Sequence, residues 1–188
     1  MTLVELLIVA GLAAIISLAL YSVLGNGLQV WKRTQKVFIE EDVLVFFEKL
    51  SSDLNNGIHF NGLDFGGNSE NFECATLIYD PLFSAYTIGK TLYSYESSGA
   101  ITRTQKNYSQ IFTGEEVAAS RLVPQVASAR FSYYVFDAQK EEYTWQPYYS
   151  SPRLPAAIRV ELELQGDNVE RIFTKTVAIP GHAFQSTP

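Results

Sequence analysis

The sequence predicts an α+β fold in which one long N-terminal helix packs on an antiparallel β-sheet domain. Three observations support this prediction: an uncharged apolar segment continues into a helical pattern, a glycine-rich segment interrupts that pattern, and aromatic or β-branched runs separated by turns follow. With 188 residues, 47% of them hydrophobic, the chain is long enough for one domain and one additional element. We expect a transmembrane and assembly half-helix (1–27), an amphipathic half-helix (28–56) and a strand-rich globular domain (57–188).

The first predicted element is a membrane helix. No charged residue occurs between Leu6 and Trp31, and about 20 apolar residues are enough to cross a hydrocarbon core of about 30 Å as a helix. A secretory signal peptide would begin with a basic region, carry a shorter apolar core and end at a small-residue cleavage site. We therefore expect this helix to be retained in a single-pass arrangement.

The helical pattern then continues in an amphipathic form. Apolar residues recur at three- and four-residue spacing, at Val43, Phe47, Leu50 and Leu54. Asn55-Asn56-Gly57 is a suitable stop signal, which predicts one helix from about Leu3 to Asn55. Gly25 and Gly27 each cost about 1 kcal/mol relative to alanine in a helix interior, so we expect local bending or melting there.

Residues after Gly57 predict strands joined by short turns. The predicted strands are 72–79, 91–96, 101–106, 129–136, 157–165 and 169–177. The clearest is 158–164, in which apolar and charged residues alternate with the period of a half-buried strand. Hairpin turns are expected at Ser97–Ala100 and at Gly166–Asn168. The segment from Tyr143 to Pro155, rich in aromatics and proline, is predicted to be an ordered surface loop.

Composition narrows the function classes. The net charge is −6 and the basic residues are scattered, so no basic patch for nucleic acid is expected. Cys74 is the single cysteine and is interpreted as a small buried apolar group in a strand. His59 and His182 are the two histidines and belong to no catalytic motif. We therefore predict a protein that is not an enzyme and needs no cofactor.

Two loops contain residue types that are common in binding sites. Asp64, Asn68 and Glu70 supply oxygen atoms of the kind that calcium prefers, but their spacing does not match an EF-hand. We interpret this loop as a solvated turn and assign no metal. The aromatic residues Trp145, Tyr148 and Tyr149 are instead predicted as interface anchors, because such residues dominate binding energy at protein interfaces.

Glu5 is the one charged residue in the apolar N-terminal segment after Met1. A carboxylate in hydrocarbon costs several kcal/mol unless a cation lies nearby. The dipole at the start of a helix and the α-amino group of Met1, or that of a neighbouring copy, supply positive charge. Glu5 is therefore a candidate assembly residue. The alternative is an acid that lies at the headgroup level in the first turn of an ordinary membrane anchor.

The opening sequence MTLVELLIVA resembles the segment after the cleavage site of type IV prepilins and type II secretion pseudopilins. The resemblance implies a pilin-like fold, removal of a leader by the prepilin peptidase, methylation of the new N-terminus at Met1 and assembly guided by Glu5. The family usually has phenylalanine where this chain has Met1. The assembly residues that the resemblance implies are Met1, Leu3, Val4, Glu5, Leu6 and Leu7.

Residues 47–54, 93–103 and 154–160, with Ile179-Pro180, are most similar to the J-type minor pseudopilin of type II secretion. This similarity implies a structural subunit in a tip or initiation complex, anchored in the bacterial inner membrane with its globular domain in the periplasm. Its implied partners are other pseudopilins or pilins in a hetero-oligomeric filament, and membrane lipids. The alternative function is a membrane-anchored adhesion or ligand-binding module whose helix is only a tether.

Overall fold

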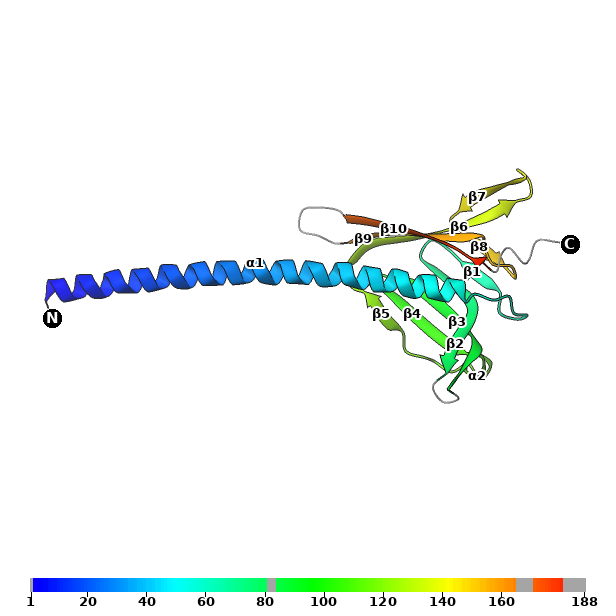
Figure 1. Cartoon of the computed structure of the whole chain (residues 1–188), viewed down its shortest axis with the longest axis horizontal. Helices are drawn as coiled ribbons and strands as arrows, with labels where there is room; N and C mark the ends of the chain where they lie inside the picture. Colours follow the sequence, from blue (N-terminus) through cyan, green and yellow to red (C-terminus); the bar gives the residue numbers. More distant parts are fainter. Residues whose placement is uncertain (1, 81–83, 165–170, 181–188) are drawn as a thin grey trace. The chain divides into compact units, whose positions relative to one another are not determined.

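A computed structural model describes residues 2–80, 84–164 and 171–180, with the backbone alone described for Leu6 and residues 32–38. The chain divides into two compact units, Met1–Glu41 and Asp42–Pro188. Helix α1 (Leu3–Asn55) supplies all the described secondary structure of the first unit and also enters the second (Figure 1). Its bounds match the predicted helix and its predicted stop. The predicted turn at Gly166–Asn168 lies outside the described residues.

The helix is unbroken at Gly25 and Gly27, so the prediction that it melts locally there is wrong. A cost of about 1 kcal/mol at each glycine is small beside the many favourable leucine and alanine positions around them. Breaking the helix would also lose the cooperative backbone hydrogen bonds of a complete turn.

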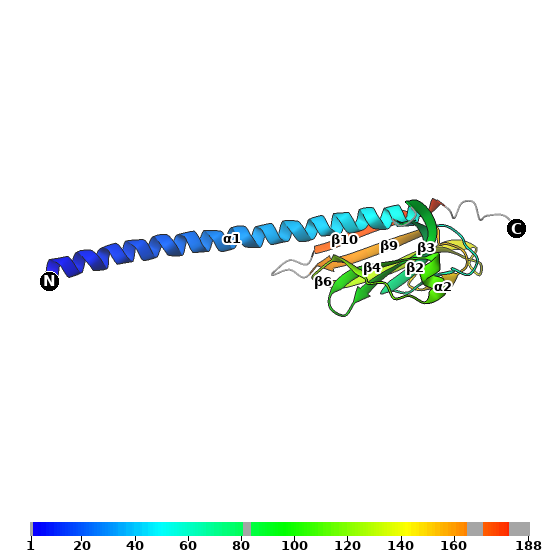
Figure 2. The same cartoon turned by 90° about the horizontal axis from the view of Figure 1, so that it is seen from below.

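The second unit contains two antiparallel sheets, seen from a second direction in Figure 2. The six-stranded sheet has the order β5-β4-β3-β2-β1-β8, formed by β1 (Phe65–Gly67), β2 (Asn71–Asp80), β3 (Ala85–Glu96), β4 (Ala100–Asn107), β5 (Ser120–Val123) and β8 (Tyr149–Ser151). The four-stranded sheet has the order β10-β9-β6-β7, formed by β6 (Val126–Asp137), β7 (Glu142–Gln146), β9 (Ala157–Leu164) and β10 (Arg171–Ala178). A short helix, α2 (Tyr108–Thr113), follows β4. The α+β class is confirmed.

Each predicted strand has a counterpart in the structure, although residues 165, 169 and 170 lie outside the described residues. The ends differ by at most three positions except in β3, which begins at Ala85, six residues before the predicted start. The turn at Ser97–Ala100 is confirmed, with Gly99 at φ 73°, where the left-handed backbone favours glycine. The prediction of an unbroken loop from Tyr143 to Pro155 is wrong, because β7 and β8 lie inside it. Both are edge strands, and Pro147 and Pro152 lie outside them, so the prolines interrupt no ladder.

The part of α1 in the second unit buries one face. Val43, Phe46 and Leu50 are fully buried and Leu54 nearly so. The apolar spacing predicts Phe47 rather than Phe46 as a core residue, but Phe47 is half-buried. Phe46 belongs to the buried face of α1 because its ring packs edge-on against Tyr93 of β3, with ring centroids 5.9 Å apart.

An ion pair fixes the last turns of α1 to the six-stranded sheet. The Arg103 guanidinium in β4 donates to both carboxylate oxygens of Asp53, from Nε to Oδ2 at 2.8 Å and from Nη2 to Oδ1 at 2.7 Å. The Tyr93 hydroxyl donates to Oδ2 at 2.6 Å. The Thr76 hydroxyl in β2 donates to the carbonyl oxygens of Asp53 and Asn56, which satisfies acceptors that every helix end leaves free. Three strands thereby hold one helix end.

Aromatic packing joins the two sheets. Phe72 of β2 stacks on Tyr93 and meets the edge of Phe131 of β6, with centroid distances of 5.2 Å in both pairs. The Tyr133 hydroxyl donates to the carbonyl oxygen of Asn68 at 2.7 Å. A side chain at Gly67 would overlap that hydroxyl, so glycine is required where β1 passes it.

We expect Asp53→Ala to lower the free energy of unfolding by about 3 kcal/mol, because it leaves the Arg103 guanidinium without its carboxylate partner in a largely buried position. Urea denaturation followed by circular dichroism measures this change. Glu48→Ala is the matched control, since it removes an exposed carboxylate from the same helix and should shift stability by at most about 0.5 kcal/mol. Equal losses in the two variants would contradict the role assigned to the ion pair.

Candidate assembly surface

The first turn of α1 is closed by a reciprocal pair of hydrogen bonds. The backbone N–H of Thr2 donates to Oε2 of Glu5 at 2.8 Å, and the backbone N–H of Glu5 is 3.4 Å from the Thr2 hydroxyl oxygen. This is a capping box, in which an N-cap threonine and a glutamate three residues later satisfy each other's backbone groups. The carboxylate lies at the positive end of the helix dipole. Met1 lies outside the described residues.

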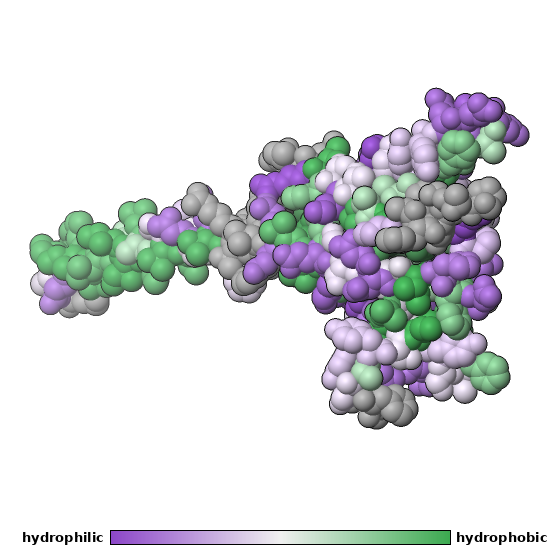
Figure 3. Space-filling view, turned by 45° about the vertical axis from the view of Figure 1, so that its right-hand side comes forward, coloured by the Kyte–Doolittle hydropathy of each residue, from purple (hydrophilic) through white to green (hydrophobic). Residues whose placement is uncertain are grey.

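An apolar surface follows this turn. The segment Leu3–Trp31 is long and apolar enough to cross a membrane, and none of its most apolar window is buried within the structure. Leu3, Val4 and Leu7 are 81%, 64% and 66% exposed, whereas Leu6 is described by its backbone alone. In Figure 3 the N-terminal part of α1 is covered almost continuously by hydrophobic residues. A patch of this size marks a surface that lipid or protein covers.

Small residues lie on the same segment. Ala10, Ala14 and Ser17 recur at spacings of four and three and are exposed, so they share one side of the helix. The Ser17 hydroxyl donates to the carbonyl oxygen of Ala13 at 2.8 Å, which satisfies this polar group without water. Small side chains permit helices to approach closely in membranes. This segment therefore offers a surface for helix packing as well as for lipid.

The predicted aromatic anchors separate in the structure. Trp145 belongs to β7 in the four-stranded sheet, whereas Tyr149 belongs to β8 in the six-stranded sheet and packs against Phe65. Tyr148, between the strands, is 62% exposed. Trp145 packs against Tyr134 of β6, with centroids 4.9 Å apart.

A different aromatic cluster forms around Trp145. Its members share the outer face of the β6–β7 hairpin and are Tyr134, Phe136, Tyr143 and Trp145. The guanidinium of Arg159 in β9 lies 4.0 Å from the Trp145 ring centre, a cation–π contact. The two-residue spacing in each strand is a signal from which this cluster could be inferred, because cross-strand neighbours on one face of a sheet interact.

The loop that contains Asp64, Asn68 and Glu70 has a structural role. Oδ1 of Asn68 accepts from the backbone N–H groups of Glu70 and Asn71 at 2.8 and 2.9 Å, so this oxygen closes a turn before β2. Asp64 is exposed. Within residues 2–80, 84–164 and 171–180, no group of three or more histidine, cysteine, aspartate and glutamate side chains is arranged to hold a metal ion.

The histidine and cysteine side chains are not arranged as a catalytic site within the described residues. Nδ1 of His59 lies 2.7 Å from the carbonyl oxygen of Pro152, and His182 lies outside the described residues. Cys74 is fully buried in β2. Burial, with a smaller contribution from the negative charge of Asp53, raises the pKa of the Cys74 thiol to about 12. A thiol in this state is not a nucleophile near neutral pH.

A scan against protein-family models finds no match to this chain, and a search of curated proteins finds none either.

We expect the free energy of unfolding to fall more steeply above pH 9 in the wild type than in Cys74→Ala. The folded thiol has a pKa of about 12 against an ordinary value of 9.0, so the unfolded state loses this proton first as the pH rises. The stability that the buried thiol contributes is complete below pH 9 and is lost between pH 9 and 12. Urea denaturation from pH 8 to 11 measures both slopes.

Alkylation provides the direct check on the same residue. Iodoacetamide at pH 8.5 should leave Cys74 unmodified in the folded chain and modify it in urea, as mass spectrometry detects. Modification of the folded chain at the rate of the unfolded chain would contradict the assigned burial.

Proposed function

We propose that this protein is a structural subunit of a type IV pilin-like filament, of the minor pseudopilin kind. The observation that carries the proposal is the exposed apolar surface of Leu3–Trp31 with Glu5 in its first turn. In this proposal the segment first lies in the inner membrane, with the globular domain in the periplasm. It then packs against the equivalent helices of other subunits.

The apolar surface supports both stages. Exposed leucine, isoleucine and valine side chains are stable in hydrocarbon, and they remain stable when similar helices replace the lipid. Because lipid tails and leucine side chains are equally apolar, helix association depends on close packing and polar contacts rather than on a hydrophobic gain. Ala10, Ala14 and Ser17 provide a side that permits close packing. Glu5 provides the polar group.

Glu5 retains acceptor capacity after it closes the capping box. A carboxylate offers about four acceptor positions, and the hydrogen bond from Thr2 occupies one of them. We propose that the α-amino group of a neighbouring subunit occupies others. Partnering offsets the several kcal/mol that an isolated carboxylate costs in hydrocarbon. It also sets the axial position of the neighbour, since the first and fifth residues of a helix differ by about 6 Å along its axis.

The resemblance of residues 1–10 to the segment after the prepilin cleavage site supports this assignment. The similarity to the J-type minor pseudopilin favours a tip or initiation complex of type II secretion. Cleavage of a leader by the prepilin peptidase and methylation of Met1 belong to the same proposal. The proposed partners are other pseudopilins or pilins, and the role is structural without catalysis or a cofactor.

Replacement of Glu5 separates its two roles. Glu5→Gln keeps the side-chain carbonyl that a capping box needs, because glutamine serves at this position as glutamate does, but it removes the charge. We expect Glu5→Gln to reduce incorporation into filaments by about tenfold or more, equivalent to about 1.4 kcal/mol. Co-purification of the variant with sheared filaments, relative to its membrane level, measures incorporation.

Thr2→Ala is the matched control, because it removes the capping hydroxyl and keeps the Glu5 charge. We expect it to affect incorporation less than Glu5→Gln does. If Glu5→Gln assembles like the wild type, Glu5 acts as a helix cap or headgroup-level acid and the electrostatic part of the proposal fails.

A helix exchange distinguishes a subunit from a tether. Replacing residues 6–24 by an unrelated apolar helix preserves membrane anchoring by hydrophobicity alone but removes the small-residue side. We expect this variant to reach the membrane at the wild-type level and to fail in filament incorporation. Undiminished incorporation, or full activity without any filament, would favour the anchored binding module instead.

A further inference from the structure

Strand β10 has one open edge in the described part of the chain. It pairs with β9 in an unbroken register from Arg171↔Leu164 to Ala178↔Ala157, and it is the terminal strand of its sheet. The opposite edge of such a strand presents backbone N–H and C=O groups in a row. Eight residues give this edge a length of about 27 Å at about 3.4 Å per residue. β10 has no proline and no bulge to interrupt it.

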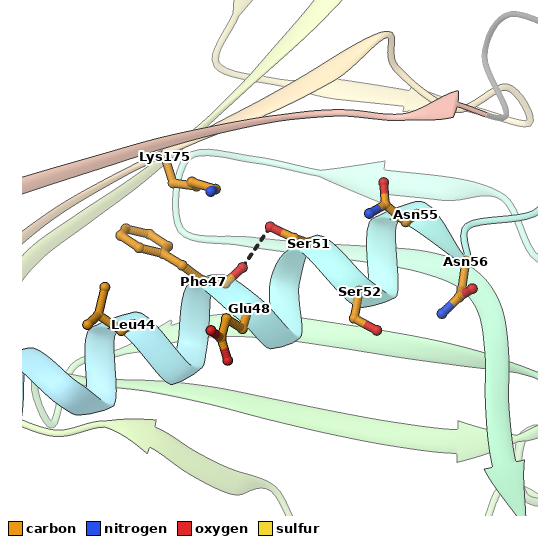
Figure 4. Close-up of a pocket in the computed structure, with 8 residues that line it drawn as sticks. All are labelled: Leu44, Phe47, Glu48, Ser51, Ser52, Asn55, Asn56 and Lys175. Atoms are coloured by element: carbon orange, nitrogen blue, oxygen red, sulfur yellow. Dashed lines mark hydrogen bonds between the residues drawn. The ribbon is translucent and has the colours of Figure 1, made fainter.

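A groove of ≈ 770 Å³ lies between β10 and the part of α1 in the same unit. Figure 4 shows the residues that line it, which are Leu44, Phe47, Glu48, Ser51, Ser52, Asn55, Asn56 and Lys175. Leu44 is 61% exposed and Phe47 is half-buried, so one end of the helix wall is apolar. The other end carries serine and asparagine side chains.

Lys175 places a positive charge on the inner face of this edge. It pairs across the ladder with buried Val160, and two residues further along Val177 is buried on the same face. In Figure 4 Lys175 extends over the groove near Phe47 and Ser51, and Glu48, which also lines the groove, is drawn on the other side of the helix ribbon from Lys175. No carboxylate of the described residues, Glu48 included, forms an ion pair with Lys175.

We infer that this groove binds an extended segment of a partner protein, which adds to β10 as an antiparallel or parallel strand and places an acidic side chain against Lys175. The open edge selects a strand, because only an extended chain satisfies a row of backbone groups. The apolar wall selects an apolar side chain beside the acid. This contact is separate from the helix packing of the proposed function and gives the globular domain its own selectivity.

The charge argues against a second copy as the occupant. Two β10 strands paired in the register centred on Lys175 place their two Lys175 ammonium groups directly opposite each other, and like charges in that position destabilise a sheet. An inward-facing lysine on an edge strand discourages pairing with ordinary apolar strands. An acidic partner segment changes that repulsion into an attraction.

The test uses the full chain in detergent micelles and a fluorescein-labelled octapeptide of alternating threonine and valine with one central glutamate. Fluorescence anisotropy should show binding of this peptide. A matched peptide with lysine in place of glutamate should bind at least about tenfold more weakly. A third peptide, N-methylated on alternate amides, should not bind, because methylation removes the backbone donors along one edge.

Variants locate the contact. Lys175→Glu should reverse the preference between the glutamate and lysine peptides, and Leu44→Ser, which removes the apolar wall without adding a charge, should weaken both. Arg121→Glu, an equal charge change at an exposed position on β5, is the matched control and should leave binding unchanged. Hydrogen exchange should show slower exchange within residues 171–178 when the glutamate peptide is bound.

Three outcomes would overturn the inference. They are no binding at millimolar peptide, equal binding of the glutamate and lysine peptides, and protection confined to segments other than β10. Self-association of the chain that Lys175→Glu alters, seen by analytical ultracentrifugation, would replace the partner segment by a second copy. None of these outcomes bears on filament incorporation through Glu5, so the two proposals fail independently.

Discussion

The constraint on which this molecule depends is that one helix serves two environments. Residues of α1 up to Trp31 expose leucine, isoleucine and valine side chains that water cannot solvate favourably. The last turns of the same helix form part of a protein core. The first part needs lipid or other helices, whereas the second needs the sheet domain. The last turns of α1 are fixed to the sheet domain at Asp53, which is held by Arg103 and Tyr93. A bidentate guanidinium–carboxylate pair is suited to this position because it fixes orientation as well as distance.

The capping box gives Glu5 a function in the isolated chain that is compatible with the function proposed for it in an assembly. The hydrogen bond to Thr2 orders the first turn and directs the carboxylate towards the helix N-terminus, where the dipole is positive. An amine that approaches along this direction meets an acceptor that is already oriented. Because the Glu5 side chain is already ordered, it loses less conformational entropy when a partner binds. The cap that the structure shows and the assembly role that we propose for Glu5 therefore require the same geometry.

The sequence was sufficient for features that depend on local pattern. The helix bounds, the turn at Gly99 and the alternating strand β9 follow from capping, glycine and period-two signals. The sequence does not predict features that depend on contacts between residues far apart in the chain. Asp53 and Arg103 lie fifty positions apart, so no local pattern pairs them, and Phe46 rather than Phe47 is buried because Tyr93 packs there. Edge strands β7 and β8 are not predicted, because the nearby prolines favour a loop. The sequence predicts Trp145 as an interface anchor together with Tyr149, but cross-strand pairing gives Trp145 Tyr134 as a neighbour and separates it from Tyr149.

Selectivity in a filament of several subunit types requires more than apolar helices. Helices rich in leucine and alanine pack with many similar partners, so they supply cohesion but little discrimination. Discrimination requires groups whose burial is unfavourable with the wrong partner. In the proposed filament Glu5 would have this property for axial position, because a misaligned neighbour would leave its carboxylate without an amine. Lys175 would have it for identity, because a segment without an acid would leave the ammonium group beside the groove unpaired. The two proposals thus assign cohesion and recognition to different parts of the chain, the apolar segment and the open edge of β10.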